Sequence, residues 1–309
     1  LVDYHARAAI AATVDVILSR SITGNSIGAK LTIPQGTLFT DSSGNSWLSA
    51  RDVTWYSNVT TCKVPIVQHE KYTASALNNM VIPTGDRVII HLGTLPNGKY
   101  YEQGSMSLQI GGETWVLVDT FAKSKPTDKH FMVSVDEALN PYIMFGDGTF
   151  GKKPAAGAKI TNVVFYLTNG TQGNVKSNTI TSVPSVISSS ITDATVSNAY
   201  DAGGGSNYEN FTMLKEHIPL SVKTLGVAIT KEDFESLAML VDGVNKAKAD
   251  YECGRKLTVY ISPDGGAVAS SELINRVYNL LSQRAPMTTW LKVKSAGKVQ
   301  IILEMDVTG

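Results

Sequence analysis

The stretch at residues 142–154, YIMFGDGTFGKKP, joins an apolar segment to three closely spaced glycines. Residues 142–145 have the apolar and aromatic side chains of a strand, and a second apolar, β-branched segment follows at 159–167. A further turn-rich run, NGTQGNV, occupies residues 169–175. Apolar segments bounded by glycine and asparagine predict strands and turns. The role of the glycines decides between two kinds of fold.

The first interpretation is a nucleotide site. Gly146, Gly148 and Gly151 match G-x-G-x-x-G, the fingerprint of dinucleotide-binding folds. That fingerprint needs a helix that opens at the third glycine and turns its N-terminus to the pyrophosphate. Here KKPAAG and a β-branched strand follow, and the acidic residue expected about 20 residues later is missing. The sequence therefore disfavours this interpretation.

The second interpretation is a tight hairpin. Gly146 and Gly148 then adopt backbone conformations closed to other residues. Asp147 accepts hydrogen bonds from its own backbone in the turn. Phe145 and Phe150 are expected to pack on either side. The predicted structural turn motif comprises Gly146, Asp147, Gly148, Phe150 and Gly151.

The composition indicates a folded protein with few surface charges. A chain of 309 residues is long enough for two or three domains, and 43% of the residues are hydrophobic. Basic and acidic residues number 27 each, so no charge excess points to nucleic acid or to an anionic membrane. Only 17% of the residues are charged, which we interpret as a hint of large protein–protein contacts.

Two cysteines, Cys62 and Cys253, lie too far apart in sequence to suggest a disulfide framework. Two free thiols fit folding in a reducing cytoplasm. No apolar run approaches the length of a membrane span. The chain begins at Leu1 without a signal sequence, which predicts a fragment or a processed product.

Secondary-structure signals differ along the chain. Residues 1–19 predict a helix, because Ile10, Val14, Ile17 and Leu18 form one apolar stripe at helical spacing. Period-two alternation then predicts sheets with one solvated face. The expected strands lie near residues 31–33, 37–40, 47–48, 53–55, 64–66, 88–92, 108–110, 115–118, 131–135, 142–145 and 159–167.

The last third changes character. Serine and threonine crowd residues 179–197, and Gly203, Gly204 and Gly205 follow, which predicts a linker with a possible hinge. A capping-box-like start at Thr230 predicts one helix, and Ser270 or Ser271 caps a second. Strands are expected at 257–261, 290–294 and 299–305. Alternating helices and strands predict an α/β sandwich of ferredoxin-like type.

The predicted fold class is therefore α+β, with β-rich N-terminal and middle domains before the C-terminal sandwich. The predicted regions are an N-terminal helix and β region at 1–70, a middle β-rich domain with the FGDGTFG hairpin at 71–184, a Ser/Thr/Gly-rich linker and short helix at 185–225, and a C-terminal α/β domain at 226–309.

No pattern of catalytic residues emerges. GNSIG at residues 24–28 matches G-x-S-x-G, but a nucleophile elbow needs a strand before the serine and a helix after it, the reverse of the expectation here. The histidines at 5, 69, 91, 130 and 217 lack metal-ligand spacing. Asp136 and Glu137 would point to opposite faces of a strand. We assign no catalytic, cofactor-binding or metal-binding residue.

Several separated stretches resemble one family, the baseplate J-like proteins of contractile-tailed phages. The resemblance covers most of the chain, in the order of the family. The matching stretches are IPQGTLF at 33–39, FGDGTFG at 145–151, the glycines at 157 and 170 with GNV at 173–175, GG at 203–204 with Tyr208, Glu209 and Leu214, AITKEDF at 228–234, and VYI at 259–261 with Pro263 and GG at 265–266.

This resemblance implies a baseplate wedge subunit. In the T-even phages the similar protein pairs with itself and with a neighbouring wedge protein, and its copies link the wedges into a ring around the hub. That ring changes shape when the tail contracts. The implied location is the tail baseplate of the virion, assembled in the host cytoplasm, and related proteins occur in contractile bacteriocins and injection systems. No nucleic acid, membrane, cofactor or small-molecule substrate is implied.

Two alternatives stay open at this point. A glycan-binding or glycan-cleaving tail protein would carry an aromatic-lined groove with two convergent carboxylates. A nucleotide-dependent enzyme would use the loop at residues 146–151 and be stabilised by nucleotide.

Overall fold

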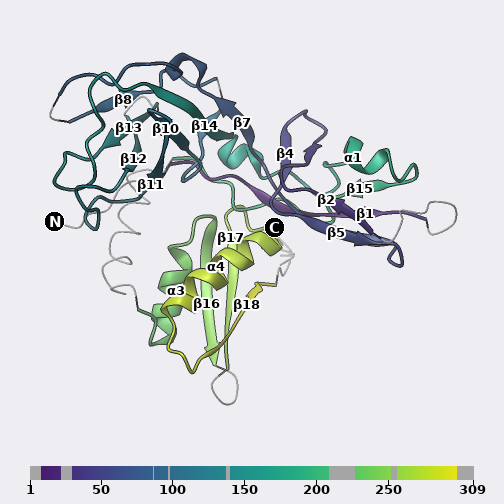
Figure 1. The fold of residues 1–309 in the computed structure, drawn as a ribbon. Coiled ribbons are helices and arrows are strands. Elements are labelled where there is room, and N and C mark those ends of the chain that lie inside the picture. Colours follow the sequence, from purple (N-terminus) through teal and green to yellow (C-terminus); the bar gives the residue numbers. More distant parts are fainter. Residues whose placement is uncertain are drawn as a thin grey trace, which may run out of the picture.

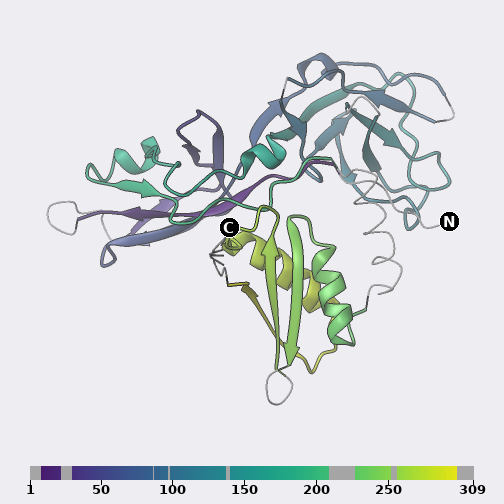
Figure 2. The same cartoon turned by 180° about the vertical axis from the view of Figure 1, so that it is seen from behind.

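A computed structural model describes residues 8–21, 30–85, 87–96, 98–136, 140–208, 227–251 and 256–297. Figure 1 shows three lobes that meet near the middle of the molecule, and Figure 2 shows the same arrangement from behind. Each lobe has a hydrophobic core of its own. The described part is mainly β-structure with few helices, which confirms a β-rich α+β fold.

The first lobe is built on a five-stranded sheet of order β15-β1-β6-β4-β3, with β2 and β5 paired beside it. Its core joins Val16 and Trp47 to Ile180, Ile187 and Val196, so it draws on two distant parts of the chain. The elements are β1 (Thr13–Ser19), β2 (Lys30–Ile33), β3 (Leu38–Thr40), β4 (Ser46–Ser49), β5 (Val53–Tyr56), β6 (Thr61–Val67), α1 (Ser185–Ser188) and β15 (Thr195–Ser197).

The middle lobe lies between these two parts of the chain. Its sheet has the order β7-β14-β10-β11-β12-β13-β8, and β9 pairs with β14. The inward faces of the strands bury one core that includes Phe131, Ile143 and Phe165. The elements are β7 (Glu70–Thr73), η1 (Ser75–Leu77), β8 (Ile89–His91), β9 (Tyr100–Tyr101), β10 (Ser107–Ile110), β11 (Glu113–Leu117), β12 (His130–Val135), β13 (Pro141–Phe145), β14 (Ile160–Thr168) and η2 (Gly170–Gly173).

The third lobe packs two helices on a sheet of order β16-β17-β18. Helix α4 crosses in front of this sheet in Figure 1 and lies behind it in Figure 2. Both helices share one core with the strands, through Phe234, Leu273 and Val259 among others. The elements are α3 (Lys231–Met239), β16 (Val244–Tyr251), β17 (Lys256–Pro263), α4 (Ser271–Arg284) and β18 (Trp290–Ser295).

The helix predicted over residues 1–19 is wrong where the structure describes it. Residues 13–19 form the strand β1, which pairs antiparallel with β6 and β15. Thr13, Val14, Val16 and Ile17 are β-branched, which favours a strand. Val14, Val16 and Leu18 are buried on one face of β1, and the apolar Ile17 lies on the half-buried opposite face, so that the apolar residues also fit helical spacing. Residues 1–7 lie outside the described part.

The Ser/Thr-rich segment is not a linker. Ile180, Ile187 and Ile191 are fully buried in the first lobe, and β15 forms an edge of its sheet. The predicted boundary at residues 184 and 185 therefore falls inside a lobe, since buried isoleucines and the pairing of β15 with β1 tie this segment to the first lobe. The short helix expected after Tyr208 lies outside the described residues.

The ferredoxin-like prediction for the third lobe stays a prediction. Both helices form where expected: Thr230 and Asp233 make a reciprocal capping box, and Ser270 caps α4. Strand β16 was missed because its sequence, VNKAKADY, carries charges on its solvated side. The described strands make a three-stranded sheet, and the strand expected at 299–305 lies outside the described part.

Candidate functional site

The FGDGTFG loop is a rigid turn. The Asp147 carboxylate accepts hydrogen bonds from the backbone N–H groups of Thr149 (2.8 Å) and Phe150 (2.9 Å). These two bonds, first from Phe150 and then from Thr149, lower the pKa of Asp147. The N–H of Gly148 donates to the carbonyl of Gly151 at 3.0 Å. The loop therefore holds its shape through its own backbone.

The glycines of this loop act in two different ways. Gly148 and Gly151 have positive φ angles of 94° and 83°, which favour glycine. Gly146 does not have a positive φ, contrary to the prediction; a Cβ built on it would overlap the backbone carbonyl of Gly151. Gly146 is thus needed for close approach and Gly148 for backbone conformation. No helix opens at Gly151, which removes the geometric basis for a dinucleotide site.

The loop does not connect two paired strands, so the predicted hairpin is corrected. Strand β13, which precedes it, pairs with β12 and β8, whereas β14, which follows it, pairs with β10, β7 and β9. Phe145 is buried as expected, but the side chain of Phe150 is 53% exposed. The turn thus presents an aromatic ring to solvent instead of packing it.

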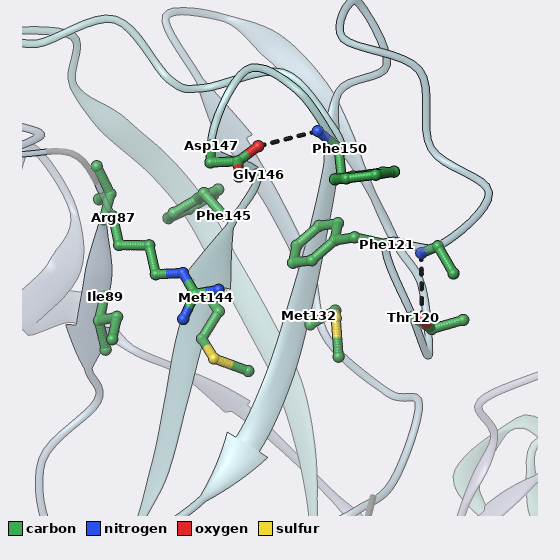
Figure 3. A pocket seen from close by; sticks show the side chains of 12 residues that line it. Arg87, Ile89, Thr120, Phe121, Met132, Met144, Phe145, Gly146, Asp147 and Phe150 are labelled. Atoms are coloured by element: carbon green, nitrogen blue, oxygen red, sulfur yellow. Dashed lines mark hydrogen bonds between the residues drawn. The ribbon is translucent and has the colours of Figure 1, made fainter. Parts of the chain in front are cut away.

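A groove of about 480 Å³ lies beside this loop. Figure 3 shows its walls, with Phe121 and Phe150 on one side and Arg87 and Ile89 on the other. Its lining residues are Arg87, Val88, Ile89, Thr120, Phe121, Ala122, Met132, Met144, Phe145, Gly146, Asp147 and Phe150. We call it the Phe150 groove.

The titratable groups that the sequence raised as candidates make pairwise structural contacts. His69 Nδ1 lies 2.9 Å from Glu102 Oε2, and His130 Nδ1 lies 2.8 Å from the Ser124 hydroxyl. Asp136 accepts the N–H of Asn140, and Glu137 lies outside the described part.

Within the described ranges, no three His, Cys, Asp or Glu side chains gather as metal ligands would. No helix described here combines the length and the apolar character needed to cross a membrane.

The run Gly203-Gly204-Gly205 lies buried where the three lobes meet. Gly203 pairs with Thr13 of β1 through two backbone hydrogen bonds of 2.8 and 3.1 Å. The N–H of Gly204 donates to the carbonyl of Asp264 in the third lobe, at 3.0 Å. A Cβ built at Gly203 would lie 2.8 Å from the Ala267 Cβ. The glycines therefore allow a close approach of chain segments, and this lobe junction is packed.

Asn174 holds the same run from the side of the middle lobe. Its side-chain amide donates to the carbonyl of Gly205 (2.8 Å) and accepts the N–H of Gly205 (2.9 Å). Gly265 packs against this amide, since a Cβ built there would lie 3.5 Å from Asn174 Nδ2. Three turn motifs that are far apart in sequence thus meet at the lobe junction.

Helix α4 of the third lobe points its N-terminus at β1 of the first. The Asp15 carboxylate accepts the backbone N–H of Ser271 (2.9 Å) and the Ser271 hydroxyl (2.6 Å), and it pairs with Lys63 at 2.8 Å. The Ser270 hydroxyl donates to Thr13 Oγ1 at 2.7 Å. An anion at a helix N-terminus is favoured by the helix dipole. The contact between the two lobes is therefore polar.

The sequence did not single out several residues of these sites. Met132 and Met144 gave a signal, since they are apolar at positions of β12 and β13 whose sequence neighbours point into the core. Arg87 and Phe121 lie in irregular segments and gave none. Asp15 was hidden by the helical interpretation of residues 1–19.

No family model matches the sequence, and no curated protein matches it. Among solved structures, the chain is similar to a chain of the anti-feeding prophage baseplate, with 16% identity, a TM-score of 0.24 and coverage of 94% of this chain. It spans only 57% of that chain. It is also similar to a chain of the type VI secretion system TssK–TssF–TssG baseplate subcomplex, with 10% identity, a TM-score of 0.44, and coverage of 98% of this chain and 93% of that one.

Proposed function

We propose that this chain is a structural subunit of the baseplate wedge in a contractile tail, with no active site of its own. It links wedges into a ring around the hub, and that ring rearranges on contraction. The equivalent subunit of a contractile bacteriocin or injection system would do the same work. The partners are other copies of the chain and other baseplate wedge proteins.

One observation carries this proposal: three of the motifs that resemble the baseplate J-like family meet at the lobe junction. Asn174 contacts Gly265 there, and it also contacts Gly205, which follows the glycine pair at 203–204. Gly204 bonds to the third lobe beside them. These residues set how the lobes are placed. A subunit that works by shape depends on such placement, and contacts repeated around a ring become strong because later ones are intramolecular.

A hinge at Gly203, Gly204 and Gly205 is part of the proposal. Separate cores and a polar contact between the first and third lobes favour movement of whole lobes. The hydroxyl oxygens of Thr13 and Ser270 lie 2.7 Å apart. The double substitution Thr13→Cys and Ser270→Cys would therefore place two thiols where a disulfide can lock the first lobe to the third. Oxidised particles that contract as readily as reduced ones would refute the hinge.

The wedge role is tested by deleting the protein from a particle-producing strain. We expect electron micrographs to show tails without assembled baseplates, and complementation to restore them. Intact baseplates in the deletion strain would refute the proposal. Light scattering of the purified chain at several concentrations then tests self-association, with a dimer expected.

The glycan alternative is not favoured. Asp147 is the one carboxylate among the lining residues of the Phe150 groove, and it is engaged by two backbone N–H groups. Cleavage of a glycosidic bond normally requires a second carboxylate facing the first.

A further inference from the structure

One row of residues on the outer face of the middle sheet is apolar, where polar residues are expected. Ile89, Met144 and Met132 lie opposite one another on β8, β13 and β12. Their neighbours along each strand point to the core, so this row faces outward. The outward face of such an antiparallel sheet normally carries polar residues. An apolar row there marks an interaction surface.

This row forms the floor of the Phe150 groove. The wall formed by Phe121 and Phe150 is already ordered before any partner binds. Gly151 packs on the Phe121 ring, since a Cβ built on it would lie 3.2 Å from Phe121 Cδ1. The two backbone bonds to Asp147 hold the turn that carries Phe150. The side chains of Phe150 and Ile89 are 53% and 44% exposed. The groove therefore stands open without a partner, at little further cost in ordering.

The charges at the rim distinguish one kind of occupant. The Asp147 carboxylate is already engaged by backbone N–H groups. Arg87 is exposed and contributes to the lowered pKa of Asp147, yet within the described part it forms no ion pair. An incoming anionic group can therefore bind the Arg87 guanidinium by charge-assisted hydrogen bonds.

We infer that the Phe150 groove binds a polypeptide segment of a different baseplate subunit, with a large apolar side chain and an Asp or Glu close to it in sequence. This inference rests on the proposed function. The volume suits a large side chain, and the exposed side chains of Phe150 and Ile89 extend the apolar surface beyond the hollow, as in a protein contact. Two methionines in the floor adapt to an inserted side chain, and Arg87 selects its acidic neighbour.

Site-specific photocrosslinking in assembled tail particles tests this. The photoreactive residue p-benzoylphenylalanine replaces Phe150, and in a matched control it replaces Tyr200, which is 58% exposed on the first lobe. We expect position 150 to crosslink one segment of another subunit that contains an apolar residue and an acidic one. We expect Arg87→Glu to lower that yield roughly tenfold, because rim charges set complementarity, while Arg87→Lys retains most of it.

The outcomes separate the two proposals. Particles that contain the chain but give no product from position 150 would overturn the groove inference alone. A product with a second copy, a product with a segment that lacks an acidic residue, or a yield unchanged by Arg87→Glu would do the same. Tail particles that lack the chain altogether would overturn the proposed function.

Discussion

Two glycine-rich runs, the FGDGTFG loop and Gly203-Gly204-Gly205, do opposite things from what their sequences suggest. The loop looked like the link between paired strands, yet it closes on itself and displays Phe150. The triple glycine looked like an exposed linker, yet it is buried among segments of all three lobes. Glycine permits both unusual φ angles and close approach. The sequence shows that a constraint exists, and only the fold shows which segment imposes it.

The largest effect is expected from Gly205→Ala. A Cβ at this position would lie 2.5 Å from the carbonyl oxygen of Gly170 and 2.9 Å from Asn174 Oδ1. Backbone atoms cannot move aside cheaply, so we expect a loss of about 3 kcal/mol in unfolding free energy. Chemical denaturation measures it. Gly297→Ala is the control, because nothing lies within 4 Å of its built Cβ. Equal stability of the two variants would show that the junction is loose.

Asp15→Ala should have the next largest effect. It removes the acceptor of both Ser271 bonds and leaves the N-terminus of α4 without its anion. We expect a loss of about 2 kcal/mol, together with faster hydrogen exchange in the first turn of α4. Lys176→Ala, which breaks the exposed pair with Asp201, is the control and should cost little. Unchanged hydrogen exchange in α4 would show that the Asp15 contact does not hold the first and third lobes together.

Asp147→Asn should act only within its own loop. The change weakens the bonds from Thr149 and Phe150, so we expect greater mobility of residues 146–151 and no change in the third lobe. Protease sensitivity and amide NMR signals report both regions. Broadened signals at the lobe junction would show that the two glycine runs are coupled.

Lowering the pH should have the smallest effect of these changes, and the pKa shift of Asp147 fixes the direction of that effect on the stability of the loop. The pKa of Asp147 is lowered from 3.8 by its backbone hydrogen bonds. A depressed carboxyl pKa stabilises the folded loop above that ordinary value, and the stabilisation is lost as pH falls through the lower, folded-state pKa. The midpoint of the titration of the Thr149 and Phe150 amide signals should therefore lie below pH 3.8. A midpoint above that pH would contradict the assignment.

Much of the strand content could be predicted because strands with one solvated face alternate. Residues 131–135 and 142–145 are strands as expected. Strand β1 was not predicted because the apolar Ile17 lies on its half-buried face, next in sequence to the buried Val16 and Leu18, and this masks the alternation. Asp147 could be assigned to its turn because its partners are two and three residues away. Arg87 and Phe121 could not be placed on the groove, since only the pairing of distant strands brings them there.

The segment that builds most of the middle lobe begins and ends beside one buried residue. Fully buried Gln68, just before β7, accepts hydrogen bonds at its side-chain oxygen from the Thr168 hydroxyl (3.1 Å) at the end of β14 and from the Asn169 N–H (2.8 Å). An insertion whose two ends touch can be excised and the host chain rejoined by a short bridge. Residues 68–169 thus leave and rejoin the first lobe at one place, while Ala8 and Tyr208 in the flanking segments also pack on the middle core and would lose that contact if the insertion were excised.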